Sequence, residues 1–255
     1  LLNCNDDGLV QIKLHNNKIL TTELLIVAEG KNSTIRAKYF PYAVNKDYKQ
    51  TAFIFNVEHQ KEHEGCAVEH FLPTGPFAIL PLVSPNQSAI VWSVESELAI
   101  AYQTLSTEEF TSQVQKLFGE FLGKINIITP ISAFNLSAQL TEKYFHNNIV
   151  LIADTAHCVH PLAGQGLNQG IKDIASLADL LSKSYALGIT PNTTMLKKYE
   201  KSRKADNFKM FLATDFLDKV FSNNSKLMSI IRSAGFWAIN NCPNLKSKII
   251  RYGVE

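Results

Sequence analysis

The chain has 255 residues, of which 45% are hydrophobic and 19% are charged, and these proportions are typical of a globular protein rather than a disordered one. Its net charge of +2 is too small to favour nucleic acid as a partner, and its four scattered cysteines form no CxxC pair, which favours reduced thiols in a cytoplasmic compartment. No apolar run approaches the roughly 20 residues that a membrane-spanning helix needs.

Residues 9–28 are predicted to form two β-strands around a turn. Val10, Ile12 and Leu14 alternate with polar residues up to the turn at 15–18, and residues 24–28 form a continuous apolar run. A continuous apolar run predicts a strand that is buried on both faces, as in a parallel sheet covered by helices. Ser33 is then predicted to cap a short helix.

The sequence changes to β-type alternation from residue 51. Gly75-Pro76 and residues 84–87 are predicted turns, and Thr107 opens a predicted helix at 106–122. The strands of an antiparallel sheet are predicted at 51–57, 68–72, 77–83 and 88–94. The fold class is therefore α/β in part and α+β overall, because this antiparallel sheet is inserted between α/β segments.

A second buried strand, a glycine-rich loop and a helix follow. Residues 149–153 are apolar and end at Asp154, and the loop 154–168 leads into a predicted amphipathic helix at 167–183. The residues of the apolar stripe of this helix are Leu167, Ile171, Ile174, Ala178 and Leu181. From residue 195 the chain is predicted to be mostly helical, with Pro243 as a late helix breaker.

The loop 154–168 has the features of a cofactor site. In open α/β sheets, ligands bind at the carboxyl ends of strands, which is where Asp154 stands. Gly164 and Gly166 would let a planar ligand approach the backbone, and the helix N-terminus would stabilise the anionic edge of a reduced flavin. The spacing from Gly164 to Gly170 is GxGxxxG, so a GxGxxG dinucleotide motif is rejected. The alternative is that the glycines serve only tight helix packing.

Four separated segments of the chain resemble one family. The stretch ADTAHCVHPLAGQGLNQGIKDIASL at 153–177 is similar to the second FAD motif of the flavin-dependent aromatic hydroxylases, most closely the branch that hydroxylates polyprenylated phenols in ubiquinone biosynthesis. The likeness continues in VAEGKNSTIR at 27–36, EHFLPTGPFAILPL at 69–82 and KYEKSRKADNFKMFLATDFLDKVFS at 198–222. Several separated motifs in the right order are more specific than one.

The resemblance implies a set of cofactor contacts. Asp154 would hold the ribityl chain of FAD, Pro161 would lie near the reactive face of the flavin, and the backbone at the end of the loop would meet its pyrimidine edge. A second motif, at 29–36, would lie near the FAD pyrophosphate and sometimes contacts NAD(P)H. The predicted contact residues are Asp154, Pro161, Gly164, Gln165, Gly166, Leu167, Asn168, Glu29, Gly30 and Arg36.

The resemblance also implies a reaction. Such an enzyme is an FAD-dependent monooxygenase, which would hydroxylate the aromatic ring of an apolar polyprenyl phenol with O2, through a C4a-hydroperoxyflavin. NAD(P)H or a reductase partner would supply the electrons, and no side chain of this chain is identified as a general base. The protein would supply orientation, electrostatics and a dry pocket.

The resemblance covers only part of an FAD-binding domain. The GxGxxG segment of the family has no counterpart here and the chain opens with Leu1, so it is interpreted as a fragment that alone binds FAD weakly or not at all. The expected parts are residues 1–42 and 143–184 for the rest of a three-layer FAD-binding domain, 43–142 for a substrate domain and 185–255 for a helical C-terminal region that packs on the FAD domain.

Two positions differ from the family pattern. The family usually has Asp where Glu29 stands and Gly where Ala153 stands. Together with the absent GxGxxG segment, these differences leave a rival hypothesis open. In it, the chain is a truncated, non-catalytic homologue with a structural role in a lipid- or quinone-biosynthesis assembly.

The segment from His59 to His63 matches the HxxEH pattern of zinc proteases. A zinc site needs both histidines on one helical turn, and the strand-like flanks predict a hairpin tip instead. No metal site is therefore expected. His157 and His160 in the loop are also expected to be satisfied by hydrogen bonds rather than by a metal.

The antiparallel sheet contains candidates for an apolar substrate pocket. These residues are Phe53, Phe55, Phe71, Phe77, Leu80 and Trp92. The alternative, that they are simply core residues, stays open.

The tail from residue 219 carries six basic residues against one acidic residue, a local charge of +5. Apolar residues are interleaved with these cations, as in helices that lie on anionic membranes. The tail therefore predicts peripheral attachment to the inner face of a membrane, or else a solvated face whose apolar side packs on the FAD domain. The basic residues are Lys219, Lys226, Arg232, Lys246, Lys248 and Arg251.

Overall fold

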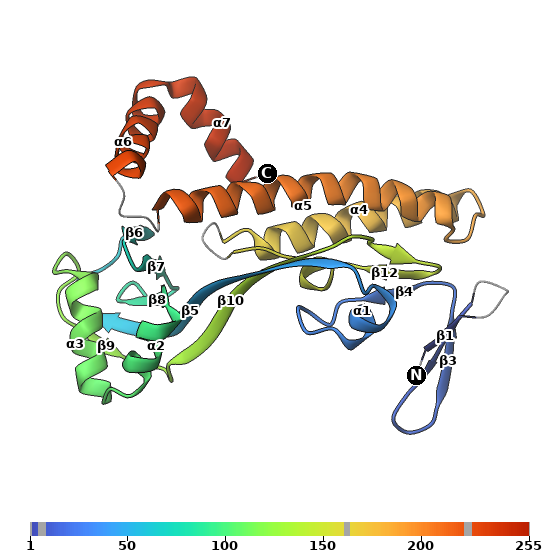
Figure 1. The fold of residues 1–255 in the computed structure, drawn as a ribbon, viewed down its shortest axis with the longest axis horizontal. Helices are drawn as coiled ribbons and strands as arrows, with labels where there is room; N and C mark the ends of the chain where they lie inside the picture. The colour runs from blue at the N-terminus through green and yellow to red at the C-terminus, as the bar shows by residue number, and fades with distance from the viewer. Residues whose placement is uncertain (1, 5–8, 161–163, 222–225, 255) are drawn as a thin grey trace. The chain divides into compact units, whose positions relative to one another are not determined.

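The structure is a computed structural model that describes residues 2–4, 9–160, 164–221 and 226–254 (Figure 1). The chain divides into two compact units, the first formed by residues 1–46 and 137–215 and the second by residues 47–136 and 216–255. The predicted domain boundaries at residues 42, 142 and 184 stay a prediction. The predicted C-terminal region, 185–255, contributes to both units, because the chain divides again after residue 215.

The first unit contains two small sheets. Strands β1 (Leu2–Cys4), β2 (Val10–Lys13) and β3 (Ile19–Thr22) form an antiparallel sheet. In the second sheet, β12 (Ile149–Leu151) pairs in parallel with β4 (Leu25–Val27) and antiparallel with β11 (Phe145–His146). The prediction of two strands in 9–28 is wrong, because the hairpin partner of β2 is β3 and the apolar run forms a third strand in another sheet.

The two strands of the parallel pair differ in burial. All three residues of β12 are completely buried, which confirms the prediction for the first three residues of the segment 149–153. In β4, Val27 is buried but Ile26 is 44% exposed. The prediction that β4 is buried on both faces is therefore wrong for the residues that the structure describes.

Helix α4 (Gly166–Ala186) follows the glycine-rich loop and confirms the helix predicted at 167–183. Its burial differs from the prediction over the first half of the helix, whereas Leu181 of the predicted stripe is partly buried against the core. Leu167, Ile171 and Ile174 of the apolar stripe are 75%, 54% and 53% exposed. The buried residues of this helix are Gln169, Gly170, Asp173 and Leu177. The face that packs on the rest of the first unit is thus polar near the start of the helix and apolar further along, at Leu177, Leu180 and Leu181.

Two further helices belong to this unit in whole or in part. Helix α1 (Thr34–Tyr39) begins where the Ser33 hydroxyl accepts a hydrogen bond from the Arg36 backbone N–H, as predicted for a cap. Helix α5 (Thr193–Phe221) buries Leu196 and Tyr199 in the core around β12, and it continues into the second unit.

The second unit contains an antiparallel sheet, as predicted. Its strands are β5 (Ala43–His59), β6 (Val68–Leu72), β7 (Gly75–Pro81), β8 (Gln87–Glu95), β9 (Ile125–Ile127) and β10 (Ser132–Thr141). The path runs β10-β5-β8-β7-β6, and β9 pairs with β5. In the first unit, the short strand β13 (His157–Cys158) pairs with the end of β10.

The turn between β6 and β7 differs from the prediction. It is made by Pro73 and Thr74, whereas Gly75 and Pro76 lie inside β7. Gly75 has a φ of 132°, and a Cβ atom placed there would lie 2.3 Å from the carbonyl oxygen of Ser93. Glycine is therefore needed at this position for the close approach of β7 to β8, and not for a turn.

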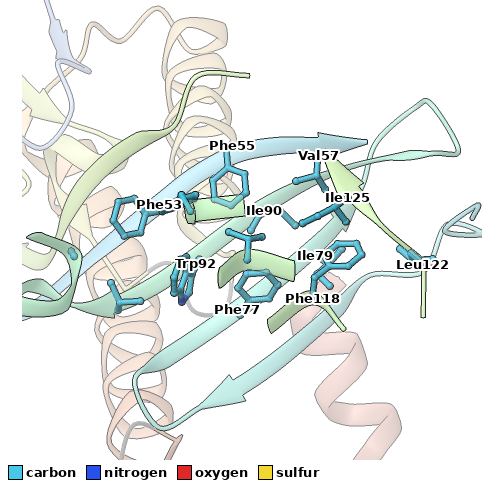
Figure 2. Close-up of a cluster of buried hydrophobic side chains, with 14 residues drawn as sticks. Phe53, Phe55, Val57, Phe77, Ile79, Ile90, Trp92, Phe118, Leu122 and Ile125 are labelled. Carbon is cyan, nitrogen blue, oxygen red and sulfur yellow. The ribbon is translucent and has the colours of Figure 1, made fainter. Parts of the chain in front are cut away.

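Helices α2 (Ser96–Gln103) and α3 (Thr107–Phe118) contribute to the core of the second unit (Figure 2). Helix α3 was predicted at 106–122 and has a complete capping box between Ser106 and Glu109. It ends four residues earlier than predicted, because Gly119 leaves the helical conformation with a φ of 77°. Helix α2 was not predicted.

The C-terminal part of this unit is helical, as predicted. Helix α6 (Lys226–Asn241) is followed by α7 (Pro243–Val254), and Pro243 is the first residue of α7. Among the helices that the structure describes, none is both long enough and apolar enough to span a membrane.

Candidate functional site

The junction between β12 and α4 carries the carboxylate predicted to bind the cofactor. Residues Ala153–Thr155 form a single 3₁₀ turn after β12, and Asp154 at its centre is exposed. A Cβ atom added to Gly166 would lie 4.0 Å from Asp154 Oδ1. The carboxylate therefore stands beside the first residue of α4, at the positive end of the helix dipole.

The two predicted FAD motifs meet at this turn. The Gly30 backbone N–H donates to Thr155 Oγ1 at 2.8 Å, and Arg36 Nη1 donates to the Thr155 carbonyl oxygen at 3.4 Å. Residues more than 100 positions apart in the sequence are thus brought side by side. Arg36 is buried, and this burial lowers the pKa of its guanidinium, although the nearby Cys158 and Glu29 act in the opposite direction.

Glu29 has a structural contact within its own motif. Its Oε2 atom accepts hydrogen bonds from the Ser33 hydroxyl at 2.6 Å and from the Ile35 backbone N–H at 3.3 Å. The longer side chain of Glu29, where the family usually has Asp, therefore reaches the first turn of α1. A carboxylate at this position stabilises the positive end of the helix dipole.

The glycines of the site leave the backbone uncovered. Gly30 and Gly164 have φ angles of 78° and 60°, and a Cβ atom added at either position would meet no described atom within 4 Å. The side chain of Gln165, the N-cap residue of α4, makes no capping hydrogen bond to a backbone N–H of this helix. An exposed carboxylate can accept hydrogen bonds from the hydroxyl groups of a cofactor, and a helix N-terminus without a side-chain cap can bind an anionic group such as the pyrimidine edge of a flavin. The residues present therefore fit FAD.

The other predicted contacts lie close by. Leu167 is largely exposed, and the Asn168 amide donates to Gln165 Oε1 at 3.1 Å. Pro161 lies outside the described residues. Cys158 is partly buried, and its burial, followed by the charge of Asp154, raises the pKa of its thiol.

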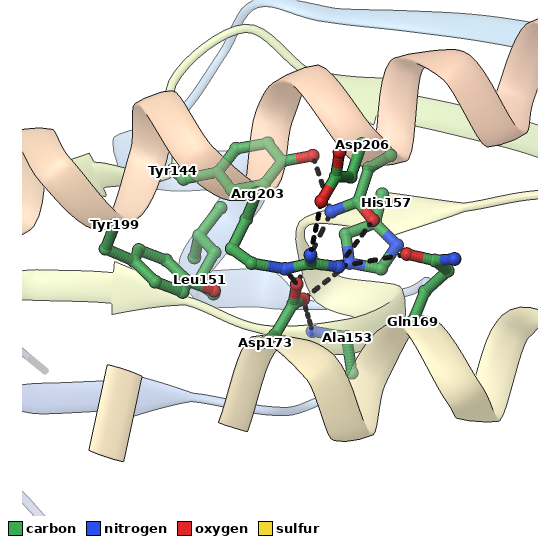
Figure 3. Close-up of polar contacts among 10 residues, drawn as sticks. Tyr144, Leu151, Ala153, His157, Gln169, Asp173, Tyr199, Arg203 and Asp206 are labelled. Atoms are coloured by element: carbon green, nitrogen blue, oxygen red, sulfur yellow. Dashed lines mark hydrogen bonds and ion pairs between the residues drawn. The ribbon is translucent and has the colours of Figure 1, made fainter. Parts of the chain in front are cut away.

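A buried polar network that the sequence did not predict contacts the turn that carries Asp154, at the backbone of Ala153 (Figure 3). Its centre is Asp173, which is completely buried and accepts hydrogen bonds from Ala153, His157 and Arg203. Burial by itself would raise the pKa of Asp173, but these hydrogen bonds outweigh it and hold the pKa below its usual value. Polar residues spaced four apart on two helices, Gln169 with Asp173 and Arg203 with Asn207, are the sequence signal that could have indicated it.

The HxxEH segment is not a hairpin tip. It joins β5 to β6, but β5 pairs with β8 and β6 pairs with β7, so the predicted hairpin is wrong. The ring nitrogens of His59 lie 2.6 Å from the Lys61 carbonyl oxygen and 3.0 Å from Ser88 Oγ, and His63 Nε2 lies 3.1 Å from the Leu82 carbonyl oxygen. No group of three metal-ligating side chains occurs among the described residues.

The six candidates for a substrate pocket lie on opposite faces of the sheet. Phe53, Phe77 and Trp92 are paired across three strands and, like Phe55, are at most 2% exposed in the core under α3 (Figure 2). Their burial favours the core alternative for these four residues. Phe71 and Leu80 are 38% and 40% exposed, and Phe71 stacks on Phe221 with ring centroids 4.0 Å apart.

Comparison with known proteins gives several relatives. The chain is 36% identical over 249 residues to the ubiquinone hydroxylase UbiL of Rhodospirillum rubrum, 31% identical to the human ubiquinone biosynthesis monooxygenase COQ6, and 29% identical to the 3-demethoxyubiquinol 3-hydroxylase of Escherichia coli. These matches cover 97%, 95% and 97% of the chain but only 58%, 59% and 63% of the relatives. The chain thus spans less than two thirds of their lengths.

Solved structures share the fold at low sequence identity. The p-nitrophenol 4-monooxygenase PnpA of Pseudomonas putida aligns with a TM-score of 0.75 and 16% identity, over 97% of this chain and 63% of its own. PqsL of Pseudomonas aeruginosa, a probable FAD-dependent monooxygenase, aligns with a TM-score of 0.73 and 17% identity, over 88% of this chain and 63% of its own. Residues 9–211 match the family described as FAD binding domain, and the chain belongs to this family.

Proposed function

We propose that this chain is the flavin-facing and substrate-facing part of an FAD-dependent monooxygenase that hydroxylates the ring of a polyprenylated phenol in ubiquinone biosynthesis. The observation that carries the proposal is the meeting of two separated motifs, through Gly30 and Arg36, at Thr155 beside Asp154. Relatives named as a ubiquinone hydroxylase and a 3-demethoxyubiquinol 3-hydroxylase support the substrate class.

The residues of the junction have distinct proposed roles. Bound FAD would supply the redox chemistry, with O2 as co-substrate and NAD(P)H or a reductase partner as the source of electrons. Asp154 would accept hydrogen bonds from the ribityl hydroxyls, and the N–H groups at the start of α4 would stabilise negative charge on the pyrimidine edge. Arg36 would place positive charge near the pyrophosphate. Pro161 is proposed to lie near the reactive face of the flavin.

The face of the sheet in the second unit that lies opposite its buried core is proposed to contact the apolar substrate. Leu80 lies on this face, and Phe71 shares it because Phe71 pairs with Pro76, four residues before Leu80 on β7. Ile54, which pairs with Val91, is on the same face and is 39% exposed. Large apolar side chains that stay exposed in this way favour an apolar ligand. Of the six predicted pocket residues, Phe71 and Leu80 are therefore retained.

A strain in which the gene for this protein is deleted tests the proposed reaction. Its quinone intermediates, separated by mass spectrometry, are expected to include a prenylated phenol that lacks one hydroxyl group. Expression of the full-length protein in this strain should abolish the accumulation of this intermediate, whereas expression of the Asp154→Ala variant should not. The absence of any accumulated prenylphenol would contradict the pathway. Equal rescue by the variant would favour the rival proposal, a non-catalytic member of a quinone-biosynthesis assembly.

Helices α6 and α7 favour a second property, attachment to an anionic membrane surface from the cytoplasmic side. Ile230, Phe236 and Trp237 of α6 are 65%, 50% and 68% exposed, and Ile249 of α7 is 48% exposed. Basic residues, including Lys246 and Lys248, are exposed on α7. Exposed apolar groups next to cations are the combination by which interfacial helices bind anionic lipids.

A further inference from the structure

The carboxylate of Asp173, on α4, connects this helix to three other segments of the first unit (Figure 3). These segments are the turn at Ala153, strand β13 and helix α5. The Oδ2 atom of Asp173 accepts from the Ala153 backbone N–H at 2.9 Å and lies 2.5 Å from His157 Nε2. Its Oδ1 atom accepts from Arg203 Nε at 2.7 Å and from Asn207 Nδ2 at 3.4 Å. Ala153 directly precedes Asp154, and His157 is three residues beyond it. One buried carboxylate therefore holds both sides of the turn that presents Asp154.

Arg203 of α5 extends the same network to the first turns of α4. Its Nη2 atom donates to Gln169 Oε1 at 2.9 Å and to Asn207 Oδ1 at 3.2 Å, and its Nη1 atom donates to Asp206 Oδ2 at 3.1 Å. Gln169 lies three residues after Gly166, where the helix begins. The guanidinium is thus bonded both to Asp173 and to the end of α4 that faces the proposed cofactor.

Physical considerations point to orientation as the role of this network. A buried ion pair of this kind gives little net stability compared with apolar residues of the same volume, because its charges lose their hydration. Hydrogen bonds to buried charged groups do, however, fix the positions of the groups that they join, and this holds here for every named contact of Asp173, while the other ring nitrogen of His157, Nδ1, has no partner among the described residues. The groups joined here are the backbone before Asp154, the strand after it and the start of α4.

We propose that Asp173, together with His157 and Arg203, is a positioning centre for the flavin. It holds the Asp154 turn and the first turns of α4 in one fixed arrangement, so that the carboxylate and the helix N–H groups face the cofactor together. Asp173 is a positioning residue and does not itself touch FAD. This inference rests on the proposed function, because it requires that FAD binds at the junction.

The test compares variants of the full-length protein by FAD affinity and by the absorbance spectrum and midpoint potential of the bound flavin. Asp173→Asn removes the charge but keeps the shape, and His157→Gln replaces the imidazole at the carboxylate with a neutral amide donor. Asp179→Asn is the matched control, because Asp179 lies on the same helix in an exposed ion pair with Lys183. Urea unfolding of each protein separates loss of stability from a change at the flavin.

The expected result is a roughly tenfold or greater loss of FAD affinity in Asp173→Asn, by analogy with groups that orient metal ligands from behind. The flavin spectrum and potential should shift in the same variant, with smaller changes in His157→Gln and none in Asp179→Asn. If Asp173→Asn does not fold, a changed flavin in folded His157→Gln supports the proposal. Wild-type flavin properties in every folded variant at this network would overturn it. Failure of the wild-type protein to bind FAD would instead overturn the proposed function and this inference with it.

Discussion

Ala153, directly before Asp154, has a left-handed backbone conformation with a φ of 52°. This conformation costs about 1 kcal/mol for a residue with a Cβ atom, whereas glycine adopts it without that cost. Glycine therefore suits the position. The same Ala153 side chain limits the helix that faces it. A Cβ atom added to Gly170 would lie 2.9 Å from Ala153 Cβ. The two positions are therefore coupled through one close contact.

Gly170→Ala is expected to lower the free energy of unfolding by about 2 kcal/mol, because the added methyl group overpacks the contact. In the Ala153→Gly background the same substitution should cost about 1 kcal/mol less, since the opposing methyl group is gone. Gly235→Ala is the control, because a Cβ atom there meets nothing within 4 Å and should stabilise α6. Urea unfolding of the four-protein cycle measures the coupling, and strictly additive effects would argue against the contact.

Asp173 is expected to make stability depend on pH. Its pKa is lowered in the folded protein, so its contribution is fully present above the unfolded value of about 3.9 and is lost as the pH falls through the folded pKa. Asp173→Asn should cost about 3 kcal/mol near pH 7, where Arg203 loses its buried partner. The difference between wild type and variant should shrink below about pH 4. A difference that stays constant from pH 7 to pH 3 would contradict this account.

At the scale of single residues, the sequence indicated the groups at the Asp154 turn but not the buried network beside them. Asp154, Gly30 and Arg36 were predicted to serve one cofactor, and the structure brings them to one turn. Asp173 was missed because a charged residue in the middle of a helix is ordinarily assigned to the solvent face. Its partner Arg203 lies 30 residues away on another helix, and no local pattern links them.

Among the elements, α3 has the clearest local signal. Ser106 Oγ accepts from the Glu109 backbone N–H at 3.2 Å, and Glu109 Oε2 accepts from the Ser106 backbone N–H at 2.9 Å. The bond from the Ser106 backbone N–H is the main cause that lowers the pKa of Glu109. Ser106→Ala should destabilise the protein by about 1 kcal/mol in urea unfolding. Ser112→Ala, at an exposed position inside the helix, should be neutral or slightly stabilising, and equal effects would argue against the cap.

For other elements the local sequence pattern was ambiguous, because their packing or pairing is set by contacts with residues that are distant in the sequence. The existence of α4 followed from its periodicity, but the periodicity does not say which face packs on the rest of the chain. That face is set by the Asp173 network and by the approach of Gly170 to Ala153. In the same way, only the apolar run at 24–28 was predicted as a strand after the turn and β3 was missed, because β3 is defined by its pairing with β2, whereas β4 pairs with β12.

On the scale of the whole molecule, the exposed apolar residues of α6 and α7 predict binding to anionic vesicles. The full-length protein should sediment with vesicles that contain anionic lipid at low salt, and less at high salt, because screening weakens the attraction of the basic residues. Replacing Trp237 by Ser should reduce the bound fraction, and Ile26→Ser, at an exposed apolar position in the first unit, should not. Equal sedimentation with neutral and anionic vesicles would contradict the membrane proposal.

The most direct test of the central claim is the affinity of the full-length protein for FAD with and without the Asp154 carboxylate. Equilibrium binding should give a dissociation constant at least about tenfold higher for Asp154→Ala, because a hydrogen bond to a charged group contributes roughly 1.5–3 kcal/mol. Asp179→Ala, on the exposed face of α4, should bind FAD as the wild type does. An unchanged dissociation constant in Asp154→Ala would contradict the assignment of this turn to the flavin.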